Sequence, residues 1–193
     1  MRLIIVRHGE TEDNVARIVQ GQTHGKLTEL GIRQAKEAGI LLSEEKIEIV
    51  FSSDLDRTRH TAAEIVRFHQ VPVHYVKELR ERHAGDFQGR HRDEFYADEN
   101  ASRMPKLSYR PKNGESLGDL RKRMEGFCEE IKKNYQDKCI LLVTHGMVAR
   151  CLASIYFNVP LEETAKWNTR NAGILILEMN GGETKKVLDT LFF

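Results

Sequence analysis

Residues Leu3-Ile4-Ile5-Val6-Arg7-His8-Gly9 decide how the rest of this chain is interpreted. The four apolar residues, mostly β-branched, predict a short buried strand, and the run stops abruptly at an arginine and a histidine. In an open α/β sheet, ligands bind outside the carboxyl ends of the strands. Arg7 and His8 would therefore place a permanent positive charge and a possible nucleophile at that edge, and Gly9 would let the backbone turn tightly.

The same layout recurs at Ile140-Leu141-Leu142-Val143-Thr144-His145-Gly146, with four apolar residues, one polar residue and then His-Gly. Parallel strands joined by right-handed crossovers end at the same edge of a sheet, so we expect His8 and His145 to lie close together. A strand predicted over 47–51 leads to Arg57 at the start of a helix, where free backbone N–H groups favour anions. This convergence predicts a pocket for an anion with several oxygens, of which phosphate is the commonest.

Predicted strands and helices alternate along the chain without a segment that could be a linker. Strands are expected at 3–6, 47–51, 72–76, 140–143, 173–179 and 185–192, and helices at 28–42, 57–69, 91–100, 116–131 and 147–157. Asn180-Gly181-Gly182 is typical of a hairpin turn, so at least one terminal strand should be antiparallel. We expect one α/β domain over 1–193. It would be a three-layer sandwich in which helices flank a mostly parallel sheet of about six strands. Residues 78–112 break the pattern and are interpreted as an irregular insertion over the site.

Composition narrows the class of partner. Thirty basic and twenty-nine acidic residues give a net charge of +1, which provides no global field for nucleic acid or a membrane surface. The three cysteines include no CxxC pair, which favours free thiols in a reducing compartment. The first apolar run is too short for a signal peptide, and no later run approaches the length of a membrane span. The sequence therefore predicts a cytoplasmic protein.

Six motifs, in order, resemble the signature of the histidine phosphatase superfamily, also called the phosphoglycerate-mutase-like family. The resemblance covers about residues 3–150. Its motifs are Arg7-His8-Gly9-Glu10-Thr11 with Asn14 and Gln20-Gly21; Leu27-Thr28-Glu29-Leu30-Gly31 with Gln34-Ala35; Ser52-Ser53-Asp54-Leu55-Asp56-Arg57-Thr58 with Thr61-Ala62; Leu79-Arg80-Glu81 with Gly85-Asp86-Phe87 and Gly89; Gly114-Glu115-Ser116; and Thr144-His145-Gly146.

The resemblance implies a fold like that of phosphoglycerate mutase and a mechanism through a phosphohistidine. His8 would be the nucleophile, and Glu81 would protonate the leaving alcohol and later accept a proton from the attacking water. Arg7, Arg57 and His145 would bind the phosphoryl oxygens and stabilise charge in the transition state. Further phosphate contacts would come from Asn14, Gln20, Gly21 and Gly146. Neither a metal nor another cofactor is expected, because arginine and histidine supply the positive charge.

Plainer interpretations compete with several of these assignments. Arg57 could be a surface partner of Asp54 or Asp56, and Glu78 or Asp86 lies close enough in sequence to compete with Glu81. Other histidines are interpreted as polar residues at the rim of the fold, namely His60, His69, His74 and His91. Basic residues of the insertion are by default a solvated surface, although one or two could touch the far end of a substrate.

The reaction itself allows several hypotheses. A phosphatase acting on small phosphomonoesters is favoured, because a brief insertion leaves the site open to water. A phosphoglycerate mutase using 2,3-bisphosphoglycerate is the first alternative, and a non-catalytic phosphate-binding regulatory protein is another. A metal-dependent hydrolase has little support, since the chain has no HExxH motif. The expected partner is a small phosphorylated metabolite, and a homodimer is possible. The sequence does not identify the physiological substrate. It also does not show whether residues 90–112 close over the bound substrate.

Overall fold

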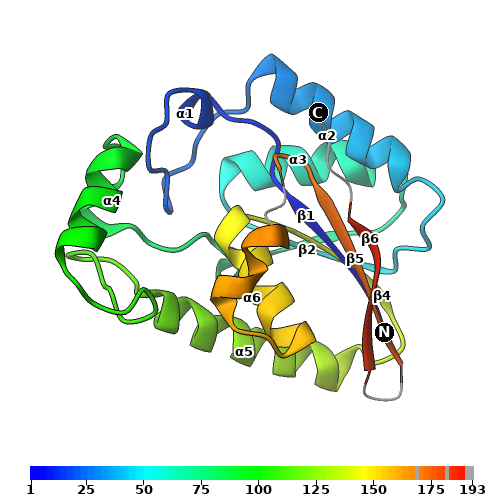
Figure 1. Ribbon diagram of the computed structural model, residues 1–193. Helices are drawn as coiled ribbons and strands as arrows, with labels where there is room; N and C mark the ends of the chain where they lie inside the picture. The colour runs from blue at the N-terminus through cyan, green and yellow to red at the C-terminus, as the bar shows by residue number, and fades with distance from the viewer. Residues whose placement is uncertain (168–169, 181–182, 190–193) are drawn as a thin grey trace.

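A six-stranded sheet forms the centre of the molecule (Figure 1). This computed structural model describes residues 1–167, 170–180 and 183–189, with the side chains of 165–167, 183 and 187–189 left out. The strands are β1 (Arg2–Arg7), β2 (Ile49–Ser53), β3 (Val73–Val76), β4 (Cys139–Thr144), β5 (Ile174–Asn180) and β6 (Glu183–Asp189). They lie in the order β3-β2-β4-β1-β5-β6; the first four are parallel, β5 is antiparallel to β1, and β6 is antiparallel to β5. The predicted sheet, with its antiparallel terminal strands, is confirmed.

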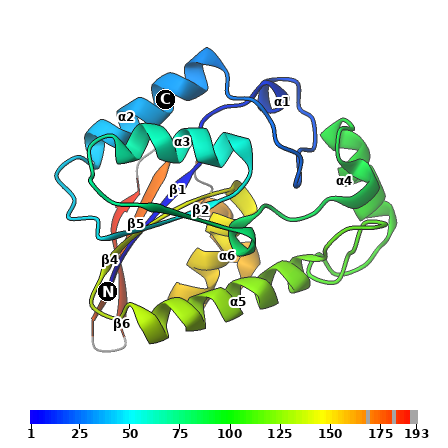
Figure 2. The ribbon, with the colours of Figure 1, turned by 180° about the vertical axis from the view of Figure 1, so that it is seen from behind.

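Helices cover both faces of this sheet. The helices α2 (Glu29–Leu41) and α3 (Asp56–Val66) lie on one face, and α5 (Leu117–Asn134) and α6 (Gly146–Phe157) lie on the other, as both views show (Figures 1 and 2). Thr28 caps α2, and Ser116 with Asp119 forms the predicted capping box of α5. The predicted three-layer arrangement is therefore confirmed.

Strand β1 shows why the sheet needs helices on both sides. Its four central residues are all fully buried, and they alternate between two apolar clusters. Leu3 and Ile5 pack with the cluster that includes α5 and α6, whereas Ile4 and Val6 pack with the cluster that includes α2 and α3. Successive side chains of a strand point to opposite faces, so a run of four apolar residues is what a doubly covered strand requires.

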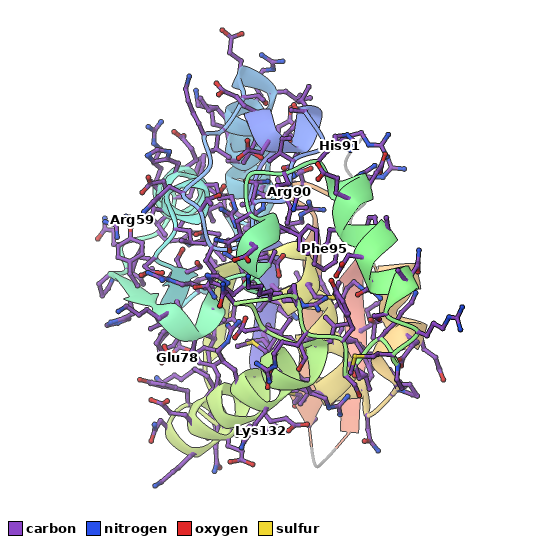
Figure 3. All side chains as sticks on the ribbon, turned by 90° about the vertical axis from the view of Figure 1, so that its left-hand side faces the viewer. Arg59, Glu78, Arg90, His91, Phe95 and Lys132 are labelled. Carbon is purple, nitrogen blue, oxygen red and sulfur yellow. The ribbon has the colours of Figure 1, made fainter. Side chains whose placement is uncertain are left out.

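The insertion contains more regular structure than its composition suggests. Helix α4 (Arg92–Ala101) occupies the predicted position, between the short 3₁₀ turn η2 (Gly85–Phe87) and the irregular residues 102–116. Both ribbon views place α4 to the side of the sheet, beside the loop that contains the single-turn helix α1 (Glu12–Val15). In Figure 3, Arg90 and His91 lie at the start of α4, and Phe95 lies on its side nearest the rest of the molecule. Phe95 is buried with Ala84 and Tyr109, which attaches α4 to the domain.

Some predicted boundaries are wrong. Strand β2 begins and ends two residues later than predicted, and at its end Ser52 pairs with both β3 and β4, and Ser53 pairs with β3. Helix α3 ends at Val66, and its C-cap Arg67 donates its N–H to Ile65 O, whereas the prediction extended the helix to 69. The 3₁₀ turns η1 (Lys77–Leu79) and η3 (Leu161–Trp167) were not predicted, since such short turns have no clear periodicity. The predicted turn residues Gly181 and Gly182 and the strand positions 190–192 lie outside the described residues.

Candidate active site

The two His-Gly motifs meet at the carboxyl edge of the sheet. Strands β1 and β4 pair in parallel with Arg7 opposite Thr144, so the next residue of each strand, His8 or His145, leaves the sheet at the same level. The centroids of the two imidazole rings lie 5.3 Å apart. The backbone confirms this register, because His8 N donates to Thr144 O at 2.9 Å. The predicted proximity of the two histidines is therefore confirmed.

His8 is held as a neutral imidazole with a defined tautomer. Its Nδ1 lies 2.7 Å from the carbonyl oxygen of Gly9, and because a carbonyl can only accept, Nδ1 carries the proton. Nε2 therefore carries the lone pair. Burial lowers the pKa of His8 well below 6.5, and the nearby guanidinium groups of Arg57 and Arg7 lower it further. At neutral pH the ring therefore has a lone pair available for attack.

Gly9 and Gly31 allow the loop after β1 to lie directly on α2. A Cβ on Gly9 would lie 2.3 Å from Gly31 O, and a Cβ on Gly31 would lie 2.0 Å from Glu10 O. Both contacts are with backbone, which cannot move as a side chain can. The Gly9 N–H also donates to Thr61 Oγ1 of α3, so the backbone beside His8 is fixed by two helices.

Arg57 is a buried cation that organises a loop. Its side chain is 1% exposed, and its guanidinium donates to three carbonyl oxygens, those of Gly21 at 2.8 Å, His24 at 3.2 Å and Thr23. Burial lowers the pKa of Arg57 to about 10, so it remains charged at neutral pH. Asp54 and Asp56 bind Arg80 and His24 instead, so the interpretation of Arg57 as their surface partner is wrong. Its buried Nε has no hydrogen-bond partner, which leaves a donor for a ligand.

The Glu81 carboxylate lies beside the N-terminus of α6, close to Gly146 and to the guanidinium of Arg7. The Glu81 carboxylate accepts hydrogen bonds from the backbone N–H groups of Arg82 at 2.8 Å and Met147 at 3.1 Å. A Cβ on Gly146 would lie 3.5 Å from Cζ of Arg7, so the Arg7 guanidinium lies close to the first residue of the helix. Free N–H groups at a helix N-terminus attract anions, and this one faces a carboxylate and a guanidinium.

His145 lies behind this surface and is fully buried. Its Nε2 is 2.9 Å from the hydroxyl oxygen of Ser53, while its Nδ1 has no hydrogen-bond partner. Burial lowers the pKa of His145 well below 6.5, and the charges of Arg57 and Arg7 add to that effect. A buried nitrogen without a partner is costly, so Nδ1 is a candidate donor to a bound anion.

Asn14 and Gln20 come from the loop between β1 and α2. Asn14 Oδ1 accepts from Thr11 N at 3.1 Å and from Asn171 Nδ2 at 3.0 Å, which leaves its own amide N–H₂ as the group for a ligand. Gln20 Oε1 is buried without a partner. Gly21 has a φ of +50°, and a Cβ there would lie 2.3 Å from Gln88 Oε1, so this turn favours glycine.

These residues line one cavity of about 620 Å³. Eight of the nine predicted site residues border it, namely Arg7, His8, Asn14, Gln20, Gly21, Arg57, Glu81 and Gly146. The ninth, His145, is in contact with His8 from behind. The outer part of the cavity is bordered by residues of the insertion and of α6, including Arg92, Phe95, Lys106, Met147 and Arg150. The structure therefore brings the predicted site residues together.

A comparison with known families decides the class of this arrangement. The model of the histidine phosphatase superfamily (branch 1) matches residues 3–190. The chain belongs to the histidine phosphatase superfamily. This confirms the family predicted from the six motifs.

Relatives of this chain include proteins of two named activities. The chain is 35% identical to the adenosylcobalamin/alpha-ribazole phosphatase of Salmonella typhimurium over 83% of its length and 81% of the relative. It is 32% identical to "Probable phosphoglycerate mutase GpmB" of Photorhabdus laumondii over 90% of this chain and 83% of that relative. The crystal structure of the alpha-ribazole phosphatase from Shigella flexneri superposes with a TM-score of 0.89 at 27% identity, covering 98% of this chain and 96% of that one. The predicted class, a phosphoric monoester hydrolase, is confirmed.

Sequence reasoning missed several residues that support this site. Ser53 bonds His145, Asn171 donates to Asn14 Oδ1, and Arg123 donates to the backbone on both sides of Leu79. Ser53 lies within the quoted motif around Arg57, so its position was a usable signal. Asn171 and Arg123 lie far from the site residues in sequence, and nothing in their local pattern indicates the contact.

Proposed function

We propose that this protein hydrolyses small phosphomonoesters through a phosphohistidine on His8, without a metal ion. The observation that carries the proposal is the state of His8. Its Nδ1–H donates to Gly9 O and its pKa is lowered, so Nε2 presents a lone pair beside two guanidinium groups. A neutral ring nitrogen is the form of histidine that attacks phosphorus.

The first step transfers the phosphoryl group to His8. Glu81 enters this step as the carboxylic acid. Nε2 forms a bond to phosphorus as the bond from phosphorus to the leaving oxygen breaks, and Glu81 gives its proton to that oxygen and becomes a carboxylate. Arg7 and Arg57 bind the equatorial oxygens together with His145, Asn14, Gln20 and the backbone at Gly21 and Gly146. Their donors are positioned before the reaction, which is the condition for stabilising charge in the transition state.

The second step returns the enzyme to its starting state. Glu81, now a carboxylate, takes a proton from water, the water oxygen bonds to phosphorus, and the bond from phosphorus to Nε2 breaks to release inorganic phosphate. The Gly9 carbonyl stabilises the positive charge that His8 carries in the intermediate, because Nδ1–H donates to it throughout.

The substrate proposed is a small phosphorylated metabolite in the cytoplasm, rather than a nucleic acid or a membrane component. The cavity supports an organic leaving group, because its 620 Å³ extends from His8 to aromatic and basic side chains of α4 and its neighbours. None of the described helices is long and apolar enough to cross a membrane.

A phosphate-release assay on a metabolite set tests the proposal, with purified protein and His8→Ala beside it. We expect free phosphate from the native protein, none from the variant, and a phosphorylated protein that is stable to base and labile to acid. Unchanged turnover in His8→Ala would disprove the phosphohistidine. A parallel assay with 3-phosphoglycerate and 2,3-bisphosphoglycerate tests the mutase alternative, which predicts transfer without free phosphate.

A further inference from the structure

The segment that carries Glu81 has almost no regular structure of its own. Residues 80–84 connect the 3₁₀ turn η1 to η2, and no strand or helix includes them. A general acid must nevertheless be placed precisely, because an error of about 1 Å can cost roughly 10²-fold in rate. The question is therefore what fixes the backbone around Glu81.

We propose that Arg123 and Glu115 form an ion pair that positions Glu81 for proton transfer. Neither residue borders the cavity, so both would be positioning residues rather than catalytic ones. The proposal rests on the role of Glu81 given above.

Arg123 reaches the segment from α5. Its Nη1 donates to the carbonyl oxygens of Glu78 and Arg80, the latter at 2.8 Å, and its Nη2 lies 3.5 Å from the carbonyl oxygen of Glu81. In Figure 3, Glu78 lies above α5, the helix on which Lys132 is labelled and to which Arg123 also belongs. One guanidinium therefore binds the carbonyls on both sides of Leu79 and lies within 3.5 Å of the carbonyl of the proposed acid.

Glu115 fixes the other side of the same segment. Its carboxylate accepts from Nε and Nη2 of Arg123 at 3.1 and 2.9 Å, and its Oε2 also accepts the backbone N–H of His83 at 2.8 Å. The ion pair thus spans residues 78 to 83 and encloses Glu81. Both side chains are about one-fifth exposed, so the pair is partly shielded from water.

Arginine is required here for its shape. Its planar fork has five donors, enough for the carbonyls of the segment and the carboxylate of Glu115 at once, whereas a lysine has a single ammonium on a flexible stem. Other contacts hold the segment when Arg123 is lost. Leu79 O accepts from Thr144 Oγ1 at 2.9 Å, and Arg80 forms two hydrogen bonds of 2.6 Å with Asp54. We therefore expect Arg123 variants to fold, with Glu81 less precisely placed.

The test compares an alkyl phosphate, which needs protonation of its leaving oxygen, with p-nitrophenyl phosphate, which hardly does. Glycerol 2-phosphate is the alkyl phosphate, and p-nitrophenyl phosphate is the aryl ester. For Arg123→Met we expect kcat/KM with glycerol 2-phosphate to fall roughly 10- to 100-fold, and kcat/KM with p-nitrophenyl phosphate to change much less. Arg123→Lys should recover little, and Glu115→Gln should change in the same direction. Arg110→Met is the matched control, because Arg110 is exposed, pairs with Asp119 and touches none of residues 78–83.

A double-mutant cycle separates positioning from general loss of structure. If Arg123 acts through Glu81, then Arg123→Met will add little to the loss caused by Glu81→Gln, because the two act as a unit. Equal losses for both esters, or full additivity with Glu81→Gln, would overturn the proposal. If Glu81→Gln itself shows no dependence on the leaving group, the acid role of Glu81 fails instead. Thermal unfolding of each variant verifies that the folded protein is being compared.

Discussion

Burial lowers the pKa of both kinds of base at this site, but only the histidines lose their charge at neutral pH. It makes His8 and His145 neutral, because desolvation penalises the imidazolium and the arginine charges add to that penalty. The same burial lowers the pKa of Arg57 only to about 10, so the guanidinium keeps its charge. One environment thus contains an uncharged nucleophile beside a permanent cation, which is the combination that attack on a phosphate dianion requires.

The neutral state of His8 predicts how stability depends on pH. Below the ordinary histidine pKa of 6.5, the unfolded chain binds a proton at His8 that the folded protein does not, so stability falls as pH falls. The free energy of unfolding, measured in urea at about pH 6.5 and about pH 5.5, should drop less in His8→Ala than in the native protein, by up to about 1.4 kcal/mol. Equal drops in the two proteins would show that His8 is not buried in its neutral form.

Arg57 should not be replaceable by lysine. Arg57→Lys keeps the charge but loses the fork that binds Gly21, Thr23 and His24 and still leaves a donor for the ligand. We expect kcat/KM for an aryl phosphate to fall roughly 10²–10³-fold, as when one donor to a transition-state oxyanion is removed. Arg59→Lys is the control. Arg59 lies two positions after Arg57, is exposed and makes a cation–π contact with Tyr75, so its replacement should change kcat/KM little. Activity near that of the native protein in Arg57→Lys would contradict the role.

At the scale of the elements, the site depends on close packing between a loop and a helix. The loop after β1 lies on the N-terminal turn of α2 through Gly9 and Gly31, with no side chain between the two backbones. Thr28 caps that helix and also donates to Glu10 at 2.9 Å, which joins the loop to the helix a second time. The position of His8 therefore depends on where α2 begins.

Two glycine substitutions should have opposite effects on stability. Gly31→Ala places a methyl group 2.0 Å from Glu10 O and should destabilise the protein by about 1–3 kcal/mol, with loss of activity as the loop shifts. Gly126→Ala, in the middle of α5 with nothing within 4 Å of the added Cβ, should stabilise it by about 0.5–1 kcal/mol. Urea unfolding of both variants measures the difference. A harmless Gly31→Ala would mean that the loop and the helix can separate without cost.

At the scale of the whole molecule, the site lies where five parts of the chain meet. The carboxyl edge of the sheet contributes His8 and His145, the loop between β1 and α2 contributes Asn14, Gln20 and Gly21, and α3 contributes Arg57. Helix α6 contributes its N-terminus, and the insertion contributes Glu81 and, together with α6, the outer wall. The buried charges that result come from arginines, and the described residues include no group of three or more His, Cys, Asp or Glu that could hold a metal ion.

We expect hydrolysis to be insensitive to chelators. We expect protein dialysed against EDTA to release phosphate from an aryl ester at the rate of untreated protein, because arginine donors neutralise the phosphoryl oxygens. The measurement is the initial rate before and after dialysis, with zinc or magnesium then added back. A loss of rate that either metal restores would support a metal-dependent mechanism instead.

Local pattern predicted the strands and most helices because both were strongly marked. Ile140 to Val143 is an uninterrupted apolar run, and the apolar residues of α5 recur every three or four positions. The boundaries of β2 and α3 were less predictable, since they depend on pairing with β4 and on where a backbone N–H finds an acceptor.

The sequence alone determined the α/β class, the family and which side chains would gather, because these follow from periodicity, from the order of motifs and from the rule that parallel strands end at one edge. Only the tertiary structure decided the partner of His145 Nε2 and the contacts of Arg123. Those depend on atoms that lie within 3 Å of one another in space but 45 or 92 positions apart along the chain, as with Arg123 and Glu78 or His145 and Ser53. No local pattern records such a distance, because it is set by how helices and strands pack.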